Sequence, residues 1–403
     1  MSDQLPQDYA APDLPEHDPF ELSEATIYHL APELNFPFTT SFGSYKRRDT
    51  VLLALRTTDD LVALGEAPTL PDPAFDSEYV YGVIDVLQRF LLPMVRDQLG
   101  GTVAHYDDFW TTFKKIKGHH FAKSSFESAY WQLVMQQLEQ PLVALWGGVQ
   151  ESVPAGFSLG AKTAEEIFQR AAAAVERGFG RIKVKIWPEL DVAHVIGTLR
   201  EKYPDVMLQV DANSAFDPRD PDHQRVLSSL DQFELLLIEQ PFRHDDIFDH
   251  ARFQAEHDLR TPITLDESIK TLEDARTAAE IWRMFGISDR LFLNIKPPRV
   301  GGYWQSVLIA DLALQEHLEC WVGGMLDMTP GKWMNITFAS HPACRLPGDH
   351  MQPQPYYQQD IATPLPTLNP DSTITVPKTG MGCEIDWAAV EKMTVGKWIV
   401  KMR

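Results

Sequence analysis

Five charged residues end five successive short apolar segments, and their spacing constrains the fold more than any other feature of the chain. Lys185, Asp211, Glu239, Asp266 and Lys296 follow one another at intervals of 26 to 30 residues. That interval is about the length of one strand and one helix. In a parallel (β/α) barrel, the carboxyl ends of successive strands meet at one mouth. The spacing therefore predicts a barrel whose mouth holds three carboxylates and two lysines.

The sequence around these residues alternates between strand-like and helix-like segments. Helices between them have recognisable starts, with Thr163 and Thr271 as N-caps followed by carboxylates in the first turn. Seven such units fit a barrel or a doubly wound sheet. Acidic residues at consecutive strand ends favour the barrel, because an open sheet would spread them along one edge. Strands are expected near residues 153–158, 181–187, 206–212, 234–240, 262–267, 290–296 and 319–324.

The flanking segments predict a second, smaller domain. Strand-like runs from about residue 25 to 67 are followed by helical stretches over about 77–98 and 122–140, which is an α+β arrangement. A mobile loop is expected over 37–43. The fold class is therefore α/β, a modified (β/α)7β barrel of the TIM type with an N-terminal α+β capping domain. The expected boundaries are an acidic, disordered extension over 1–22, the capping domain over 23–148, the barrel over 149–370, and a C-terminal segment over 371–403 returning to the capping domain.

Composition narrows the class of partner. The chain has 403 residues and a formal net charge of −21, which argues against binding to nucleic acid or to an anionic membrane surface. The segment starting at Met1 has no apolar core of a signal peptide, and no run of about 18 apolar residues occurs. Cys320, Cys344 and Cys383 lack the spacing of a disulfide framework or a zinc site. We therefore expect a cytoplasmic enzyme with a small-molecule substrate.

The three carboxylates have the chemistry of a divalent-metal site. Asp211, Glu239 and Asp266 offer hard oxygen ligands, and three monodentate carboxylates leave about three positions open on an octahedral Mg²⁺ ion. Each carboxylate alone could instead cap a helix at a βα turn. Together at one mouth without a metal, they would repel one another and take up protons. The expected cofactor is Mg²⁺, with Mn²⁺ as an alternative.

The lysines indicate proton transfer. Lys183 and Lys185 lie two residues apart, so they share one face of their strand, whereas the neighbouring Ile182, Val184 and Ile186 are apolar. A partly desolvated lysine beside a cation can act as a general base. Lys296 is expected to face the mouth from the opposite side. An opposing lysine can protonate the other face of the substrate, which gives racemisation, or only stabilise charge, which gives elimination.

Beyond these residues, the chain resembles the enolase superfamily, in its muconate-lactonising-enzyme subgroup with a Lys-x-Lys base. Within that subgroup it is most similar to the branch of o-succinylbenzoate synthases and N-succinylamino acid racemases. The similarity extends from about residue 25 to 395. Besides the five strand ends, it rests on the segments Pro37–Gly43, Gly65–Ala67, Phe121–Lys123 with Glu127, Gly323–Leu326, Leu346–Asp349 and Gly380–Glu384.

The resemblance implies a role for each matching residue. Lys185 would be the base that removes the α-proton, Lys296 the opposing lysine, and Lys183 the partner that tunes Lys185. Asp211, Glu239 and Asp266 would bind Mg²⁺. The remaining implied roles are support of these residues by Asn213 and Gln240, and substrate binding by Thr40, Ser41 and Phe42 from the capping domain and by Gly323, Gly324 and Met325 from the barrel.

Two positions bear on the choice of reaction. The family usually has Glu after Gly-Gly-Met-Leu, whereas this chain has Asp327, which puts substrate positioning near the seventh strand in question. Arg299 lies three residues after Lys296, as in racemase-capable members. A guanidinium there would favour the neutral form of Lys296 and make it a working acid and base.

The implied reaction is Mg²⁺-dependent syn-dehydration of 2-succinyl-6-hydroxy-2,4-cyclohexadiene-1-carboxylate to o-succinylbenzoate, a step of menaquinone biosynthesis. The alternative is racemisation of N-succinylamino acids, as the sole or a second activity. Dipeptide epimerisation, cycloisomerisation and a non-catalytic, ligand-binding barrel are further alternatives. An unrelated metal-dependent hydrolase would normally use histidine ligands, and these strand ends offer none. Relatives are often dimers or octamers, so a homo-oligomer is expected.

Overall fold

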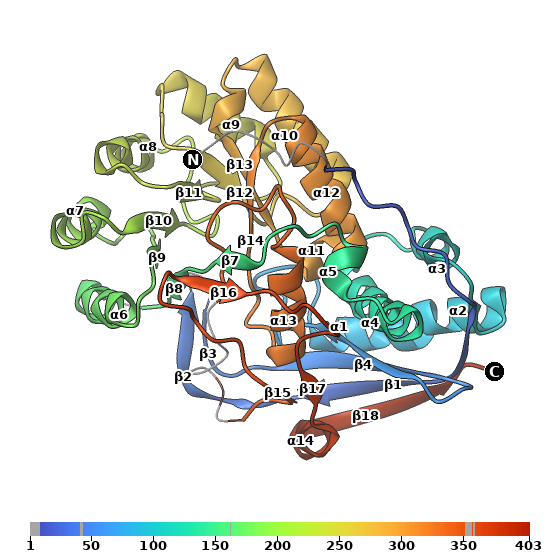
Figure 1. The fold of residues 1–403 in the computed structure, drawn as a ribbon. Coiled ribbons are helices and arrows are strands. Elements are labelled where there is room, and N and C mark those ends of the chain that lie inside the picture. The colour runs from blue at the N-terminus through green and yellow to red at the C-terminus, as the bar shows by residue number, and fades with distance from the viewer. Residues whose placement is uncertain (1–8, 41–42, 162, 351–356, 358) are drawn as a thin grey trace.

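The computed structural model describes residues 9–403 apart from 41–42, 162, 351–356 and 358, and describes the backbone alone for 36–40. A capping domain and a barrel lie against each other, with the capping sheet at one side of the barrel (Figure 1). Across the described ranges, no helix is long and apolar enough to cross a membrane.

The capping domain is an antiparallel sheet covered by helices. Its strands run in the order β18-β1-β4-β5, with the short β6 also paired to β1. The bounds are β1 Phe20–Leu30, β4 Thr50–Thr57, β5 Val62–Ala67, β6 Thr102–Val103 and β18 Thr394–Lys401, with β2 Glu33–Thr40 and β3 Gly43–Arg47 forming a separate hairpin. The helices are α1 Val80–Val86, a π-helical turn Leu87–Leu91, α2 Leu92–Leu99, α3 Tyr106–Phe113, α4 His120–Leu138 and α5 Leu142–Leu145.

The barrel expected from the residue spacing is confirmed. Seven parallel strands run in the order β14-β13-β12-β11-β10-β9-β8. The segment 344–349 stands between the first and last of them, because Asp349 N donates to Val322 O (2.9 Å) and Gly156 N donates to Gly348 O (2.8 Å). The strands are β8 Phe157–Leu159, β9 Arg181–Lys185, β10 Met207–Asp211, β11 Ile238–Glu239, β12 Ile263–Leu265, β13 Leu291–Ile295 and β14 Glu319–Val322.

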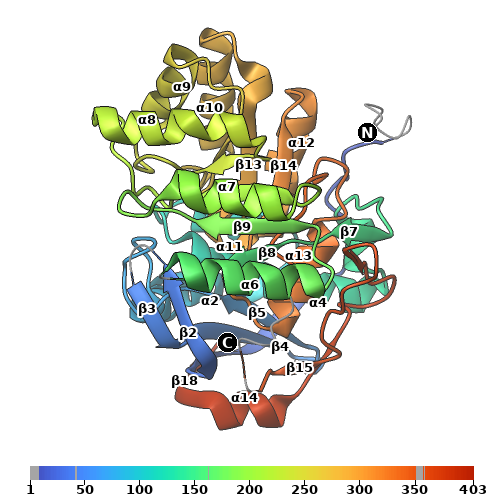
Figure 2. The same cartoon turned by 90° about the vertical axis from the view of Figure 1, so that its left-hand side faces the viewer.

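Helices surround the barrel on its outer side, where α6, α7 and α8 lie one above another (Figure 2). Both predicted N-caps are confirmed: Thr163 Oγ1 accepts from Glu166 N, and Thr271 Oγ1 accepts from Asp274 N. The helices are α6 Ala164–Glu176, α7 Val192–Lys202, α8 Pro221–Ser229 with a 3₁₀ turn Leu230–Phe233, α9 Ile247–Glu256, α10 Leu272–Met284 with a 3₁₀ turn Ser288–Arg290, α11 Pro297–Val300, α12 Tyr303–Gln315 and α13 Thr329–Phe338.

Alternation along β9 decides which side chains face inward. Ile182 and Val184 are buried among the apolar core residues beneath the helices. Lys183 and Lys185 point the other way, because successive side chains of a strand lie on opposite faces. The same alternation along β13 sends Leu293 outward and Asn294 inward, toward Glu239 on β11.

The C-terminal segment reaches both domains in turn. β16 (Thr373–Thr375) pairs with β7 (Ser152–Pro154) beside the barrel. The chain then passes through β17 (Glu384–Ile385), which pairs with β15 (Ala362–Thr363), and α14 (Trp387–Met393). It ends in β18, which pairs with β1. The expected return to the capping sheet is therefore made by the last strand, not by the whole of 371–403.

Two expectations near the N-terminus need correction. The boundary at residue 22 falls inside β1, and the described part of the expected extension lies on the body: Tyr9 Oη donates to Asp311 Oδ1 (2.9 Å), and His17 hydrogen-bonds Tyr130 Oη (2.8 Å). Aromatic side chains anchor this acidic stretch. Within the expected mobile loop 37–43, residues 37–40 belong to β2 and Gly43 begins β3, whereas 41–42 lie outside the described residues.

Candidate active site

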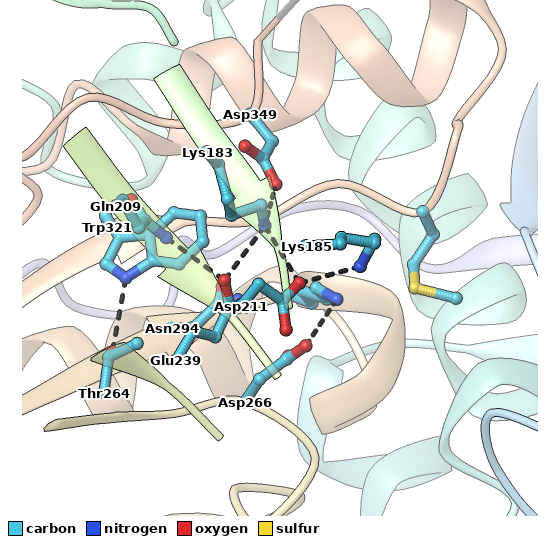
Figure 3. Close-up of polar contacts among 12 residues, drawn as sticks. Lys183, Lys185, Gln209, Asp211, Glu239, Thr264, Asp266, Asn294, Trp321 and Asp349 are labelled. Atoms are coloured by element: carbon cyan, nitrogen blue, oxygen red, sulfur yellow. Dashed lines mark hydrogen bonds and ion pairs between the residues drawn. The ribbon is translucent and has the colours of Figure 1, made fainter. Parts of the chain in front are cut away.

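Four of the five residues that constrain the fold, Lys185, Asp211, Glu239 and Asp266, lie together at one mouth (Figure 3). The fifth, Lys296, joins them because its Nζ lies 2.8 Å from Asp266 Oδ2. Lys185 and Asp211 are direct partners in the β9–β10 ladder, and Asp211 and Glu239 are direct partners in the β10–β11 ladder. Partners in a parallel ladder project from the same face of the sheet. Asp266 and Lys296 directly follow β12 and β13. With β10, β11 and β12 between them, the strands that carry Lys185 and Lys296 stand on opposite sides of the mouth.

Lys183 is locked into an ion-pair network beneath the mouth. Its Nζ lies 3.0 Å from Glu239 Oε2 and 2.7 Å from Asp349 Oδ2, and the Trp321 ring centroid is 4.9 Å away. Burial alone would lower the pKa of Lys183, but the carboxylates of Asp349, Glu239 and Asp211 outweigh burial and raise that pKa. Lys183 is therefore held as a cation, and it contributes positive charge beside the carboxylates of the site.

Lys185 lies nearer to the opening, with 11% of its side chain exposed. Its Nζ is 2.8 Å from Asp211 Oδ2 and also donates to Asn213 Oδ1. Asn213 is held in turn, because its backbone N–H donates to Asp211 Oδ1 (2.9 Å) and its side-chain amide donates to Glu267 Oε1 (3.0 Å). Asn213 therefore orients both Lys185 and Asp211, which fits the supporting role that the resemblance implies.

Lys296 and Arg299 share one carboxylate. Lys296 Nζ is 2.8 Å from Asp266 Oδ2, while Arg299 Nη1 donates to Asp266 Oδ1. Burial would raise the pKa of Asp266, but Lys296 and Arg299 hold it below its ordinary value. Arg299 also donates to Ile269 O (2.8 Å), which fixes the guanidinium. Its influence on Lys296 therefore passes through Asp266.

Glu239 is fully buried, as Asp266 is. It accepts hydrogen bonds from Asn294 Nδ2 (2.8 Å) and Gln209 Nε2 (3.1 Å). Burial and the neighbouring Asp211 raise the pKa of Glu239 to about 8, against the opposing effect of Lys183. Gln240 points away from this cluster. Its Oε1 accepts from Asp266 N (2.9 Å) and its Nε2 donates to Ser268 Oγ (2.8 Å), so Gln240 supports the backbone beside Asp266.

The carboxylates do not form a finished metal cage. Across the described ranges, no three His, Cys, Asp or Glu side chains converge closely enough to hold a metal ion as they stand. Asp211 and Asp266 are turned toward lysines instead. The donor chemistry nevertheless fits Mg²⁺, since three oxygen donors stand on neighbouring strands at one mouth. Burial and Asp211 raise the pKa of Glu239, and a divalent cation bound there would favour its ionised form.

Of the expected substrate-binding residues, the three from the barrel, Gly323, Gly324 and Met325, all lie within the described residues. A Cβ on Gly323 would lie 2.4 Å from Asn294 Oδ1 and 2.7 Å from Lys296 Cε, so a side chain at this position would displace Asn294 or Lys296. Gly324 and Met325 follow and are partly exposed. Ser41 and Phe42 lie outside the described residues, and Thr40 ends β2 without a described side chain.

Three further residues contact the site, although the sequence pattern assigned no role to them. Asp349 pairs with Lys183 and with Arg181 (2.9 Å), Asn294 donates to Glu239, and Glu267 accepts from Asn213. Burial and the charge of Asp266 raise the pKa of Glu267 to about 7. Strand alternation could have found Asn294, which lies two residues before Lys296. Asp349 belongs to a segment that carried the family resemblance, but its contact with Lys183 depends on the closing of the barrel.

Comparison with known proteins identifies the family. Residues 22–147 match the family model of the mandelate racemase / muconate lactonizing enzyme N-terminal domain, and residues 166–389 match the model described as enolase C-terminal domain-like. The two matched ranges correspond to the capping domain and the barrel.

Individual relatives cover almost the whole chain. An o-succinylbenzoate synthase from Geobacillus stearothermophilus is 37% identical over 370 residues, which is 91% of this chain and 94% of the relative. An N-succinylamino acid racemase from Thermus thermophilus is 34% identical over 377 residues, 93% and 97% of the two chains. The crystal structure of an enolase superfamily member from Listeria innocua superposes with a TM-score of 0.86 at 30% identity, covering 95% of this chain and all of that one. The chain therefore belongs to the enolase superfamily, with the capping domain and barrel of the mandelate racemase and muconate lactonizing enzymes.

Proposed function

We propose that this chain is an o-succinylbenzoate synthase, a lyase that dehydrates 2-succinyl-6-hydroxy-2,4-cyclohexadiene-1-carboxylate. The observation that carries the proposal is the pair of lysines, Lys185 and Lys296, flanking three carboxylates at the mouth of the barrel. Relatives named o-succinylbenzoate synthase that align over about nine tenths of the chain support the choice of substrate.

Asp211, Glu239 and Asp266 would hold Mg²⁺, or Mn²⁺ in its place. When bound, the metal supplies a Lewis acid that stabilises the enediolate formed when the substrate loses its α-proton. Lys183 forms an ion pair with Glu239, and the Asn294 amide donates a hydrogen bond that orients it. Arg299 likewise forms an ion pair with Asp266. These contacts keep the carboxylates in place, and the carboxylates in turn hold Lys185 and Lys296 at the mouth.

Lys185 would act as base and then as acid. Its ammonium is held by Asp211 and Asn213, at the more exposed edge of the site. The neutral amine takes the proton from the carbon next to the substrate carboxylate. The hydroxyl group leaves from the same face, so the same lysine returns the proton and water departs. The ring gains its third double bond and becomes aromatic. Lys296 contributes positive charge on the opposite face.

Racemisation of N-succinylamino acids is the second candidate, and one contact favours it. Arg299 donates to Oδ1 of Asp266 while Lys296 donates to Oδ2, so the guanidinium offsets part of the carboxylate charge that holds the Lys296 proton. Racemisation needs both lysines, one on each face of the α-carbon, whereas syn-dehydration needs one. A relative named N-succinylamino acid racemase aligns over 93% of the chain.

The test is turnover by the purified protein with Mg²⁺ and the cyclohexadiene substrate, followed by the absorbance of o-succinylbenzoate. We expect turnover by the wild type and a loss of about 10²–10⁴-fold in Lys185→Ala, the range that general acid–base catalysis contributes. Lys397→Ala, a change of an exposed lysine on β18, is the matched control and should keep full activity. A folded, metal-loaded wild type without turnover would contradict the synthase proposal, and N-succinylamino acids would then be tested. Absence of α-proton exchange in D₂O with every substrate would favour a binding barrel without catalysis.

A further inference from the structure

The segment from Gly324 to Met328, called here the β14 loop, joins β14 to α13 and borders the mouth. Residues 321–344 are buried except for Gly324, Met325 and Leu326, which are partly exposed. The loop starts next to Gly323, whose Cβ position is 2.7 Å from Lys296 Cε. The three partly exposed residues therefore follow directly after the glycine that adjoins Lys296.

Groups from distant parts of the chain hold the backbone of this loop. Arg48 Nη2 donates to Met325 O (2.8 Å), and Met328 N donates to Glu66 Oε2 (3.1 Å). Arg48 and Glu66 both belong to the capping domain. Between these two points, Tyr357 Oη donates to Leu326 O (2.6 Å). Three of the five loop residues are thus fixed by groups outside the loop, two of them by residues of the capping domain.

The loop has a strained conformation that needs such support. Leu326 has a φ of +57°, in the left-handed region. This conformation costs a residue with a side chain about 1–2 kcal/mol. Such residues persist only where the surroundings determine them, and they gather at binding and catalytic sites. Here the surroundings are the hydrogen bonds on either side of Leu326, including the internal one from Met325 N to Asp327 Oδ2 (3.0 Å).

Arg48 and Glu66 are themselves buried, with 1% and 7% of their surface exposed. The hydrogen bonds of Arg48 within the described ranges go to backbone carbonyls, those of Asp49, Pro68, Thr69 and Met325. Because the buried guanidinium of Arg48 donates to backbone carbonyl oxygens, it fixes the positions of the segments that carry them. Two of these carbonyls belong to the turn after β5 and one to the β14 loop, so Arg48 joins the two domains at the edge of the mouth.

We propose that Glu66 and Arg48 are positioning residues that hold the β14 loop against the capping domain and thereby set how tightly the substrate is bound beside Lys296. This inference rests on the proposed function. The two residues do not touch the lysines that would carry out the chemistry. Their loss should therefore raise KM and leave kcat nearly unchanged.

The test compares Glu66→Ala with Glu66→Gln. Alanine leaves the buried N–H of Met328 without its acceptor, and we expect KM to rise about tenfold while kcat stays within about threefold. Glutamine retains an acceptor oxygen of the same reach, so both constants should stay within about threefold of wild type. Tyr357→Phe removes only the hydroxyl that donates to Leu326 O, and should raise KM in the same direction even if Glu66→Ala fails to fold.

Glu127→Ala is the matched control. Glu127 is also a buried carboxylate of the capping domain that accepts backbone N–H groups of the barrel, from Tyr303 (2.8 Å) and Trp304 (2.7 Å), but at the start of α12. It should lower the melting temperature and leave KM unchanged. An unchanged KM in Glu66→Ala or, where that variant does not fold, in Tyr357→Phe would overturn the inference, as would an equal rise in Glu127→Ala. If the wild type racemises N-succinylamino acids only, the same comparison uses that substrate. A wild type that turns over neither substrate overturns both proposals.

Discussion

Asp266 divides its two oxygens between Lys296 and Arg299, and this division bears on the choice between one active lysine and two. The position of Arg299, three residues after Lys296, predicts that its guanidinium favours the neutral form of the lysine. The structure places the carboxylate between them. A guanidinium that occupies one oxygen weakens the hold of Asp266 on the lysine proton, which is how Arg299 would support exchange on that face.

Arg299→Ala should therefore slow proton exchange by Lys296 about 100-fold, the lower end of what general acid–base catalysis contributes. Lys185 is held by Asp211 and Asn213 instead, so its exchange should be affected little. Deuterium uptake from D₂O into the two enantiomers of an N-succinylamino acid reports the two lysines separately. Equal losses for both enantiomers would indicate general damage to the site, and unchanged exchange would refute the role of Arg299.

Close contact between one strand and one helix holds the capping domain in shape. β5 runs directly against α4, whose residues from Phe121 to Val134 are all buried. Gly65 allows this approach: a Cβ there would lie 1.7 Å from the backbone carbonyl oxygen of Ser125. Since Glu66 follows Gly65, the same contact fixes where Glu66 meets the β14 loop.

Gly65→Ala should consequently cost about 3 kcal/mol or more in the free energy of unfolding, at or beyond the upper end for overpacked cores, because a backbone carbonyl cannot move aside as a side chain can. Gly180→Ala is the control, since its nearest neighbour would be 3.5 Å from the new Cβ. Urea unfolding of the two variants measures the difference. Equal stabilities would show that β5 and α4 can separate without cost.

Buried carboxyl groups link the stability of the whole molecule to pH. Burial is the main cause that raises the pKa of Glu66 to about 8 and the pKa of both Glu78 and Glu127 to about 7. Glu127 and Glu66 lie where the capping domain meets the barrel, and Glu78 accepts from Phe121 N at the start of α4. In the unfolded chain these groups titrate near the ordinary glutamate value, so the folded protein binds more protons between that value and about pH 8.

Stability should therefore be highest near the ordinary glutamate range and fall as the pH rises toward 8, by up to about 1.4 kcal/mol per pH unit for each group while it titrates. Urea unfolding between about pH 5 and 8 in the presence of a chelator measures the slope. Glu127→Gln should flatten it, because an amide does not titrate. Stability that rises over this range would show that these carboxyl groups remain ionised in the folded protein.

The sequence by itself determined the barrel, the alternation that turns Lys183 and Lys185 inward, and the set of lysines and carboxylates at the mouth, because strand period and unit length are local properties. Tertiary structure decided the partners. Asp349 reaches Lys183 only because residues 344–349 close the barrel, and Arg48 and Glu66 reach the β14 loop only because the capping domain lies against it. Contacts between segments hundreds of residues apart depend on how the elements pack, and no local pattern records that packing.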